Sequence, residues 1–284
     1  MKKILVPTDY SPLSINALDF AIDIAQTAGA EIHLVHFLNA PIEAVTFNEL
    51  MQENTDSRQD FYSDLDLDTH RSRLKEIIRS KADRGTNISS AIGGSGVILG
   101  SDKYVDAFAI DLLVLGADDV EEEKGEFPIS YSQELTQNLK IPVISLTDHV
   151  DYVDMTKLVL GVDPNKHKDL EGLGKMIGPV INSMDAEVYL VDVIKTGETD
   201  DQQLANKLHT FARAAQLKNY KVVVIKHPDD LDGLLKYADK VDAGLVALVS
   251  DGKPNIFRFF KDSFATTVVK ATDMPVLVFN SNGY

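Results

Sequence analysis

The chain has 284 residues, about twice the length of a typical domain, so its length predicts two domains and excludes a single small one. Its 28 Lys and Arg against 44 Asp and Glu give a formal charge of −16, which argues against broad binding to nucleic acids or to anionic membranes. The chain has no Cys, which excludes disulfides, thiolate metal sites and thiol nucleophiles.

The start of the chain does not resemble a secretory signal. Met1-Lys2-Lys3 is followed directly by the strand-like run Ile4 to Val6, without a long apolar region or a cleavage site of small residues. No window holds the ~20 uninterrupted apolar residues of a membrane span. We therefore expect a water-soluble, cytoplasmic protein.

Four segments of the first half recur in the second half in the same order, which predicts two copies of one domain. The matching pairs are Lys3–Asp9 with Lys157–Asp163, Ala30–Phe37 with Ala186–Val193, Asp111–Gly116 with Ala243–Val249, and Lys140–Leu146 with Asp273–Phe279. The predicted domains are residues 1–149 and 156–284, joined by a short linker. The second copy is about twenty residues shorter.

Short Val, Ile and Leu runs alternate with longer segments of helical period in each copy. These runs are too continuous for half-exposed strands and indicate buried parallel strands. In the first helix we expect Ser11 as the N-cap, Pro12 as the first residue and Gly29 as the end, with an apolar face of Leu13, Ala17, Phe20, Ala21, Ile24 and Ala25. The predicted fold is α/β: two open, parallel, five-stranded sheets with helices on both faces.

The extra residues of the first copy fall between Phe37 and Asn87. They include an acidic stretch, Asp64 to Asp68, and a segment of helical character around Leu74 to Ile78. We expect a helix with a solvated arm there.

One aspartate follows the first strand of each copy, Asp9 in the first and Asp163 in the second. In a doubly wound sheet, ligands bind beyond the carboxyl ends of the strands where the strand order reverses, so both are candidate site residues. The alternative interpretation is that each aspartate caps the next helix or satisfies amides of its own loop.

The segments ILVPTDYS, AEIHLVHF, DLLVLGA and NLKIPVISL, with their counterparts in the second copy, resemble the universal stress protein family in its tandem form. The resemblance covers nearly the whole chain. It implies Rossmann-like domains of the adenine nucleotide alpha hydrolase type and a role in stress response. It also implies that the two halves pair through their last strands as a built-in dimer, and it admits a homodimer of two chains.

Nucleotide-binding members of that family carry a loop of pattern G-x2-G-x9-G-S/T after the fourth strand. Gly116 fits its first glycine and Ser130 its final hydroxyl, but Asp119 and Ile129 stand at the two other glycines. Glycines let the main chain approach phosphates, and the acids between residues 118 and 126 repel them. We therefore predict poor triphosphate binding in the first copy.

The second copy departs from the pattern differently. Ser263 fits the final hydroxyl, Val249 or Ser250 stands at the first glycine, and Lys253 lies near the second. Since this loop is the more basic one, it is the better candidate for holding an anion. The alternative is that both loops only connect strand to helix, with Ser130 and Ser263 as N-caps.

Other candidate motifs predict no chemistry. Gly93 to Gly96 lacks the spacing of a phosphate-binding loop and indicates a flexible turn. His33 and His36 lie three apart in a predicted strand, so they point to opposite faces and cannot chelate one ion. We predict no metal site.

Together these observations favour a non-catalytic, cytoplasmic stress-response protein with degenerate nucleotide-binding loops, no cofactor, and an unknown protein partner. The alternative is a stress switch that binds ATP or AMP with Mg²⁺ in one copy, through Asp9, Gly116 and Ser130 or through Asp163, Lys253 and Ser263. A third possibility, an adenylate-handling enzyme, is disfavoured because Pro7 to Ser11 is not glycine-rich.

Overall fold

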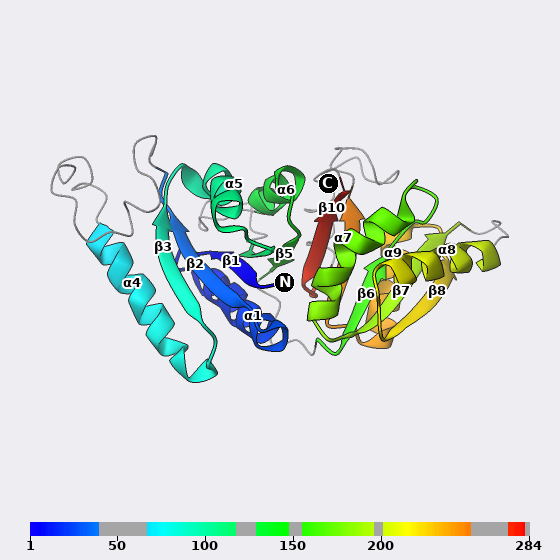
Figure 1. The fold of residues 1–284 in the computed structure, drawn as a ribbon, viewed down its shortest axis with the longest axis horizontal. Coiled ribbons are helices and arrows are strands. Elements are labelled where there is room, and N and C mark those ends of the chain that lie inside the picture. Colours follow the sequence, from blue (N-terminus) through cyan, green and yellow to red (C-terminus); the bar gives the residue numbers. More distant parts are fainter. Residues whose placement is uncertain (40–66, 118–128, 148–154, 196–200, 251–271, 282–284) are drawn as a thin grey trace.

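The structure is a computed structural model, which describes residues 1–39, 67–117, 129–147, 155–195, 201–250 and 272–281. Strands and helices alternate in both halves (Figure 1). The first half comprises β1 (Lys3–Pro7), α1 (Pro12–Ala28), β2 (Glu31–Phe37), α4 (Leu67–Ser80), η2 (Ala82–Arg84), β3 (Ile88–Gly93), α5 (Gly96–Phe108), β4 (Leu112–Gly116), α6 (Ile129–Asn138) and β5 (Val143–Leu146). The second comprises β6 (Lys157–Gly161), α7 (Leu170–Ser183), β7 (Glu187–Ile194), α8 (Asp201–Ala214), β8 (Tyr220–Lys226), α9 (Asp230–Val241), β9 (Leu245–Ser250) and β10 (Val276–Asn280).

The strands form one sheet in the order β3-β2-β1-β4-β5-β10-β9-β6-β7-β8. All pairs within each half are parallel, which confirms the predicted α/β class with five parallel strands per half. The last strands of the two halves join the two sheets into one, because β5 and β10 pair antiparallel with Leu277 opposite Ile144. This pairing satisfies main-chain groups that two free edge strands would leave unpaired.

Helix α1 forms as its sequence predicts. The Ser11 hydroxyl accepts a hydrogen bond from the Ser14 amide, Pro12 occupies the first turn, and Gly29 ends the helix in the left-handed region with φ of 65°. The fixed φ of proline suits the first turn, and only glycine enters the left-handed region without strain. These local signals therefore set both ends of the helix.

Apolar side chains pack on both faces of the sheet. One cluster lies under α1, α4, α7 and α8 and is continuous across the two halves; it includes Leu34, Leu160 and Leu277. The opposite face carries one cluster under α5 and α6 and another under α9. Neighbouring residues of a strand join different clusters, as Val6 and Leu5 do, because side chains alternate across a strand.

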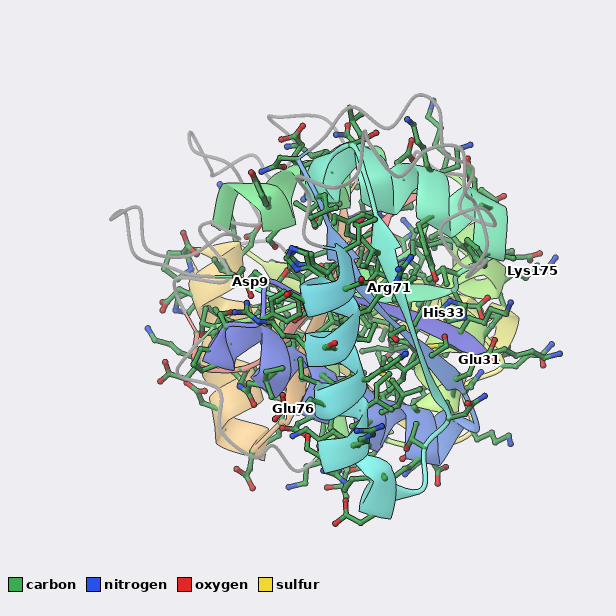
Figure 2. The ribbon with its side chains drawn as sticks, turned by 90° about the vertical axis from the view of Figure 1, so that its left-hand side faces the viewer. Asp9, Glu31, His33, Arg71, Glu76 and Lys175 are labelled. Atoms are coloured by element: carbon green, nitrogen blue, oxygen red, sulfur yellow. The ribbon has the colours of Figure 1, made fainter. Side chains whose placement is uncertain are left out.

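Helix α4 confirms the helix predicted in the extra segment of the first copy, and Leu74 is its buried residue. It packs on β3 and lies across that end of the molecule (Figure 2). Residues 40–66, which include most of the predicted acidic arm, lie outside the described part of the chain.

The strand register equates positions of the two halves. β1 places Ile4 opposite Leu112, and β6 places Leu158 opposite Leu245, so Gly116 at the end of β4 corresponds to Val249, one residue before the end of β9. Of the two residues that the sequence offers at the first glycine of the second loop, the register selects Val249. No helix in the described ranges is long and apolar enough to cross a membrane.

Candidate functional site

The strand order reverses between β1 and β4 in the first half and between β6 and β9 in the second. These are the points where a doubly wound sheet opens a crevice for ligands. Asp9 and Asp163 follow β1 and β6 and therefore lie at these points. Because β5 and β10 are antiparallel, the carboxyl ends of the parallel strands point in opposite directions in the two halves. Asp9 and Asp163 therefore lie at opposite ends of the strands in the joined sheet.

Both aspartates bind to their own loops. Asp9 Oδ1 accepts hydrogen bonds from the Ser11 amide at 3.0 Å and from its hydroxyl at 2.5 Å. Asp163 Oδ1 accepts from the amides of Asn165 at 2.9 Å and Lys166 at 3.3 Å. Both therefore satisfy loop amides, as one interpretation predicts, and a ligand contact by either stays a prediction.

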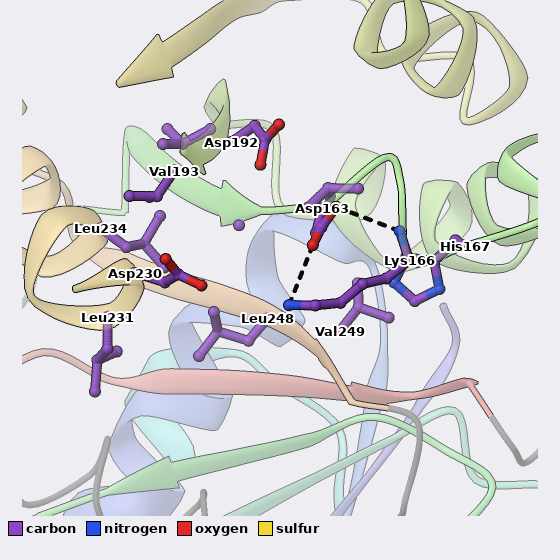
Figure 3. A pocket seen from close by; sticks show the side chains of 13 residues that line it. Asp163, Lys166, His167, Asp192, Val193, Asp230, Leu231, Leu234, Leu248 and Val249 are labelled. Atoms are coloured by element: carbon purple, nitrogen blue, oxygen red, sulfur yellow. Dashed lines mark hydrogen bonds and ion pairs between the residues drawn. The ribbon is translucent and has the colours of Figure 1, made fainter. Parts of the chain in front are cut away.

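A pocket of about 110 Å³ lies beside Asp163 in the second half (Figure 3). Since one water molecule needs roughly 10–15 Å³ by the same kind of measure, the pocket has room for a ring-sized group. Valine and leucine side chains form most of its wall, and charged side chains of the Asp163 loop, β7 and α9 complete it. The lining residues are Gly161, Val162, Asp163, Lys166, His167, Val191, Asp192, Val193, Asp230, Leu231, Leu234, Leu248 and Val249.

The charged groups of the pocket are mostly acidic. Asp163 Oδ2 forms an ion pair with Lys166 Nζ at 3.1 Å, and Asp192 is only 4% exposed. Burial raises the pKa of Asp230 above its usual value, although Lys166 and Lys195 oppose this shift. Among the described residues that line the pocket, three carboxylates against one ammonium favour donor groups such as hydroxyls and amines over phosphate.

The pocket is open because α7 begins late. Helix α1 starts at Pro12, three residues after Asp9, whereas α7 starts at Leu170, seven residues after Asp163. The longer loop ends at Asp169, whose side chain caps α7 by accepting from the Gly172 amide at 2.8 Å. The first turn of α1 thus has no helical counterpart over Val249.

In the first half the corresponding turn of α1 closes on Gly116. A Cβ atom added at Gly116 would lie 2.6 Å from the Leu13 carbonyl oxygen and 2.8 Å from Leu13 Cγ. The glycine therefore permits close packing of helix on strand. This contact explains why position 116 is a glycine without any role in phosphate binding. The predicted role of Gly116 in ligand binding stays a prediction.

The ring of Phe37 packs closely against Gly93 at the end of β3 and Gly100 of α5. Phe37 is the counterpart of Val193, a pocket residue of the second half. A Cβ atom at Gly93 or at Gly100 would lie 2.4 Å from Phe37 Cδ1, so both glycines make room for this ring. The glycine-rich segment that the sequence predicts as a flexible turn thus connects β3 to the start of α5, and its first glycine packs against Phe37.

A stack of three rings covers the loop after β1. Tyr10 stacks on His36 with ring centroids 4.6 Å apart, and His36 stacks on His70 of α4 at 4.4 Å. Tyr10 holds a φ of 70°, a conformation that costs a residue with a Cβ atom roughly 1–2 kcal/mol. His33 instead shares a 2.8 Å hydrogen bond with Tyr104 of α5, which confirms that His33 and His36 face opposite sides of the sheet.

Sequence reasoning missed the contacts that fill the first half. His36 meets His70 only because α4 packs against the sheet, and Phe37 meets Gly100 only because α5 returns over β2. The one signal available was the pairing of small residues at 93 and 100 with a large apolar residue at a strand end.

The residues predicted at the fourth-strand loops are only partly described. Helix α6 begins at Ile129, so Ser130 lies inside its first turn, and the prediction of Ser130 as N-cap is wrong, because an N-cap precedes the helical residues. Asp119, Lys253 and Ser263 lie outside the described residues. Within the described ranges, no three His, Asp or Glu side chains are placed to hold a metal ion.

Comparisons with known proteins agree with this architecture. The model of the universal stress protein family matches residues 1–145. A universal stress protein from Archaeoglobus fulgidus DSM 4304 superposes with a TM-score of 0.66 at 16% identity, over 98% of this chain and 96% of its own. A putative universal stress protein from Pseudomonas aeruginosa UCBPP-PA14 gives 0.62 at 14% identity, over 99% and 93%. No curated protein matches the chain.

At these identities the two solved structures show a shared fold over both halves, whereas the family model identifies the first half by its sequence. The match covers slightly more than half of the chain, and the second half repeats the same strand order. The chain therefore belongs to the universal stress protein family.

Proposed function

We propose that this chain is a non-catalytic, cytoplasmic regulator of the stress response that acts through protein contacts and does not depend on ATP. The observation that supports this most directly is the filled crevice of the first half, where Leu13 packs on Gly116. A nucleotide in that crevice would have to displace a helix turn and the Phe37 ring. The protein partner is unidentified.

The charge of the second-half pocket supports the same proposal. Asp163, Asp192 and Asp230 all line it. Each carboxylate within about 4 Å of a phosphate costs about 1 kcal/mol even at the dielectric constant of water, against a total of about 8 kcal/mol for micromolar affinity. A triphosphate is therefore a poor ligand for the described part of this site.

Calorimetric titration of the full chain with ATP and Mg²⁺, and with AMP, tests the proposal. We expect no saturable heat at micromolar ligand concentrations, no turnover of ATP, and no nucleotide in mass analysis of the purified protein. Saturable micromolar binding would contradict independence from nucleotide, and turnover would contradict a non-catalytic role.

The pocket itself favours a second candidate function, a switch that binds an adenine nucleotide in the second half only. Asp163 lines the pocket directly after the first strand of this half, where a doubly wound sheet holds its ligands, and a carboxylate can accept hydrogen bonds from ribose hydroxyls. In this case the titration gives one site per chain. The Asp163→Asn variant should then lose binding, while the matched control Asp9→Asn, at the filled position, should keep it.

A further inference from the structure

The ring stack of the first half joins three separate elements. Tyr10 belongs to the loop after β1, His36 to β2 and His70 to α4. Besides the stacking, the Tyr10 hydroxyl and His70 Nδ1 share a hydrogen bond of 3.0 Å. His36 Nδ1 donates to the Thr8 carbonyl at 2.8 Å, so the stack is tied to the main chain at the end of β1. The beginning of α4 is therefore held to the sheet by a ring stack that contains two imidazoles.

The other end of α4 is held by different chemistry. Lys81, directly after the helix, forms an ion pair with Asp19 of α1 at 2.7 Å, and Arg84 pairs with Asp23. The Arg84 carbonyl also accepts from Gln26 Nε2 at 2.5 Å. These three contacts contain no imidazole, so protonation of a histidine does not act on them directly.

Opposing groups surround His36. The Thr8 carbonyl and the Asp9 carboxylate favour its charged form, whereas His70 and Arg73 of α4 and the burial of the ring disfavour it. Burial is the largest of these effects, and together they lower the pKa of His36 below the ordinary value of 6.5. The Arg73 guanidinium carbon lies 5.4 Å from the centre of the Tyr10 ring, so the α4 side of the stack already carries a positive charge.

We propose that the Tyr10–His36–His70 stack is an acid-sensitive latch, in which a proton taken up by His36 frees the beginning of α4 from the sheet while the end of the helix stays anchored. A charged His36 would lie 4.4 Å from the His70 ring, in a position that is 6% exposed. Release of α4 returns His36 to water and uncovers Leu74, which is 1% exposed when the latch is closed. The latch is independent of the ligand proposal for the second half.

The direction of the effect follows from proton linkage. The open form binds a proton near pH 6.5, and the closed form binds it only at lower pH, so acidification favours opening between these two values. Below both values the effect is complete. Between pH 7.5 and pH 5.5 the open population therefore rises, by at most about tenfold for a single histidine.

Amide hydrogen exchange of the full chain, with rates corrected for the intrinsic effect of pH, tests the proposal. We expect the protection of residues 67–80 to fall between pH 7.5 and pH 5.5, by at most about tenfold. The protection of 170–183, the α7 segment of the second half, should stay unchanged and serves as the internal reference. Equal protection of 67–80 at the two pH values would overturn the proposal.

Two variants separate the latch from a general effect of acid. His36→Asn removes the titrating ring and keeps an amide that can donate to Thr8, so the pH dependence of residues 67–80 should disappear. The control His209→Asn removes a surface histidine of α8, and the pH dependence of residues 67–80 should remain. If His36→Asn does not fold by circular dichroism, an NMR titration of the unaltered chain decides, because a His36 ring that titrates at or above 6.5 contradicts the latch.

Discussion

The two halves share strand order and register but differ where the strand order reverses. In the first half, Gly116 ends β4 and the first turn of α1 packs directly on it. In the second half, Val249 lies one residue before the end of β9, the helix begins four residues later relative to the preceding aspartate, and a pocket occupies the space. The comparison teaches that the first turn of the helix can pack directly on this strand position only where the residue is glycine, which has no Cβ atom.

A second difference reinforces the first. Phe37 fills the space beside α5 in the first half, whereas its counterpart Val193 leaves room beside α9. The larger ring requires glycines at 93 and 100, so three positions have to agree for the crevice to be filled. Closure of the first half is therefore a property of a packed group and not of one residue.

Truncation of Phe37 should have the largest effect on this comparison. Phe37→Ala removes a buried ring and leaves a cavity between two glycines, so we expect a loss of about 4 kcal/mol in the free energy of unfolding. Urea denaturation measures this loss. The matched control Val193→Ala, at a partly exposed position, should cost about 1 kcal/mol. Equal costs at the two positions would remove the distinction between a filled and an open half.

Exchange of the strand-end residue should have the next largest effect. Gly116→Val places a Cβ atom within 2.6 Å of the Leu13 carbonyl oxygen, which forces α1 away, and we expect destabilisation of about 3 kcal/mol by urea denaturation. The counterpart Val249→Ala removes two methyl groups from a pocket wall and should cost about 1.5 kcal/mol. A Gly116→Val variant as stable as the unaltered chain would show that Gly116 does not govern closure.

The helix caps should show the smallest effect and the least difference between halves. The Ser11 side chain caps α1 and the Asp169 side chain caps α7, each by accepting a main-chain amide hydrogen bond. Replacement of either by alanine should cost about 1 kcal/mol in the free energy of unfolding. A much larger cost at Asp169 would indicate that this cap also shapes the pocket.

The sequence predicts those parts of the fold that depend on local signals. Ser11, Pro12 and Gly29 set the ends of α1, and the recurrence of apolar segments reveals the two copies and their parallel strands. The position of Asp163 beside a crevice follows from the topology alone. These predictions need no knowledge of which side chains meet across elements.

Local sequence signals could not predict whether the crevice of each half is closely packed or holds a pocket. Whether Gly116 binds a ligand or admits a helix depends on where α1 begins relative to β4, which is a contact between distant segments. The same applies to His36, whose neighbours His70 and Arg73 come from a helix after a long insertion. The long-range contacts that decide the candidate site carry no short sequence pattern.

The antiparallel pairing of β5 and β10 within one polypeptide has a consequence for how such a protein can vary. When two identical chains meet edge to edge, any substitution is copied onto both partners by symmetry. In this chain the two halves are encoded separately, so substitutions can pack one half closely while the other half keeps its pocket. Covalent linkage thus fixes a one-to-one ratio of two specialised partners that no mixing of subunits can disturb.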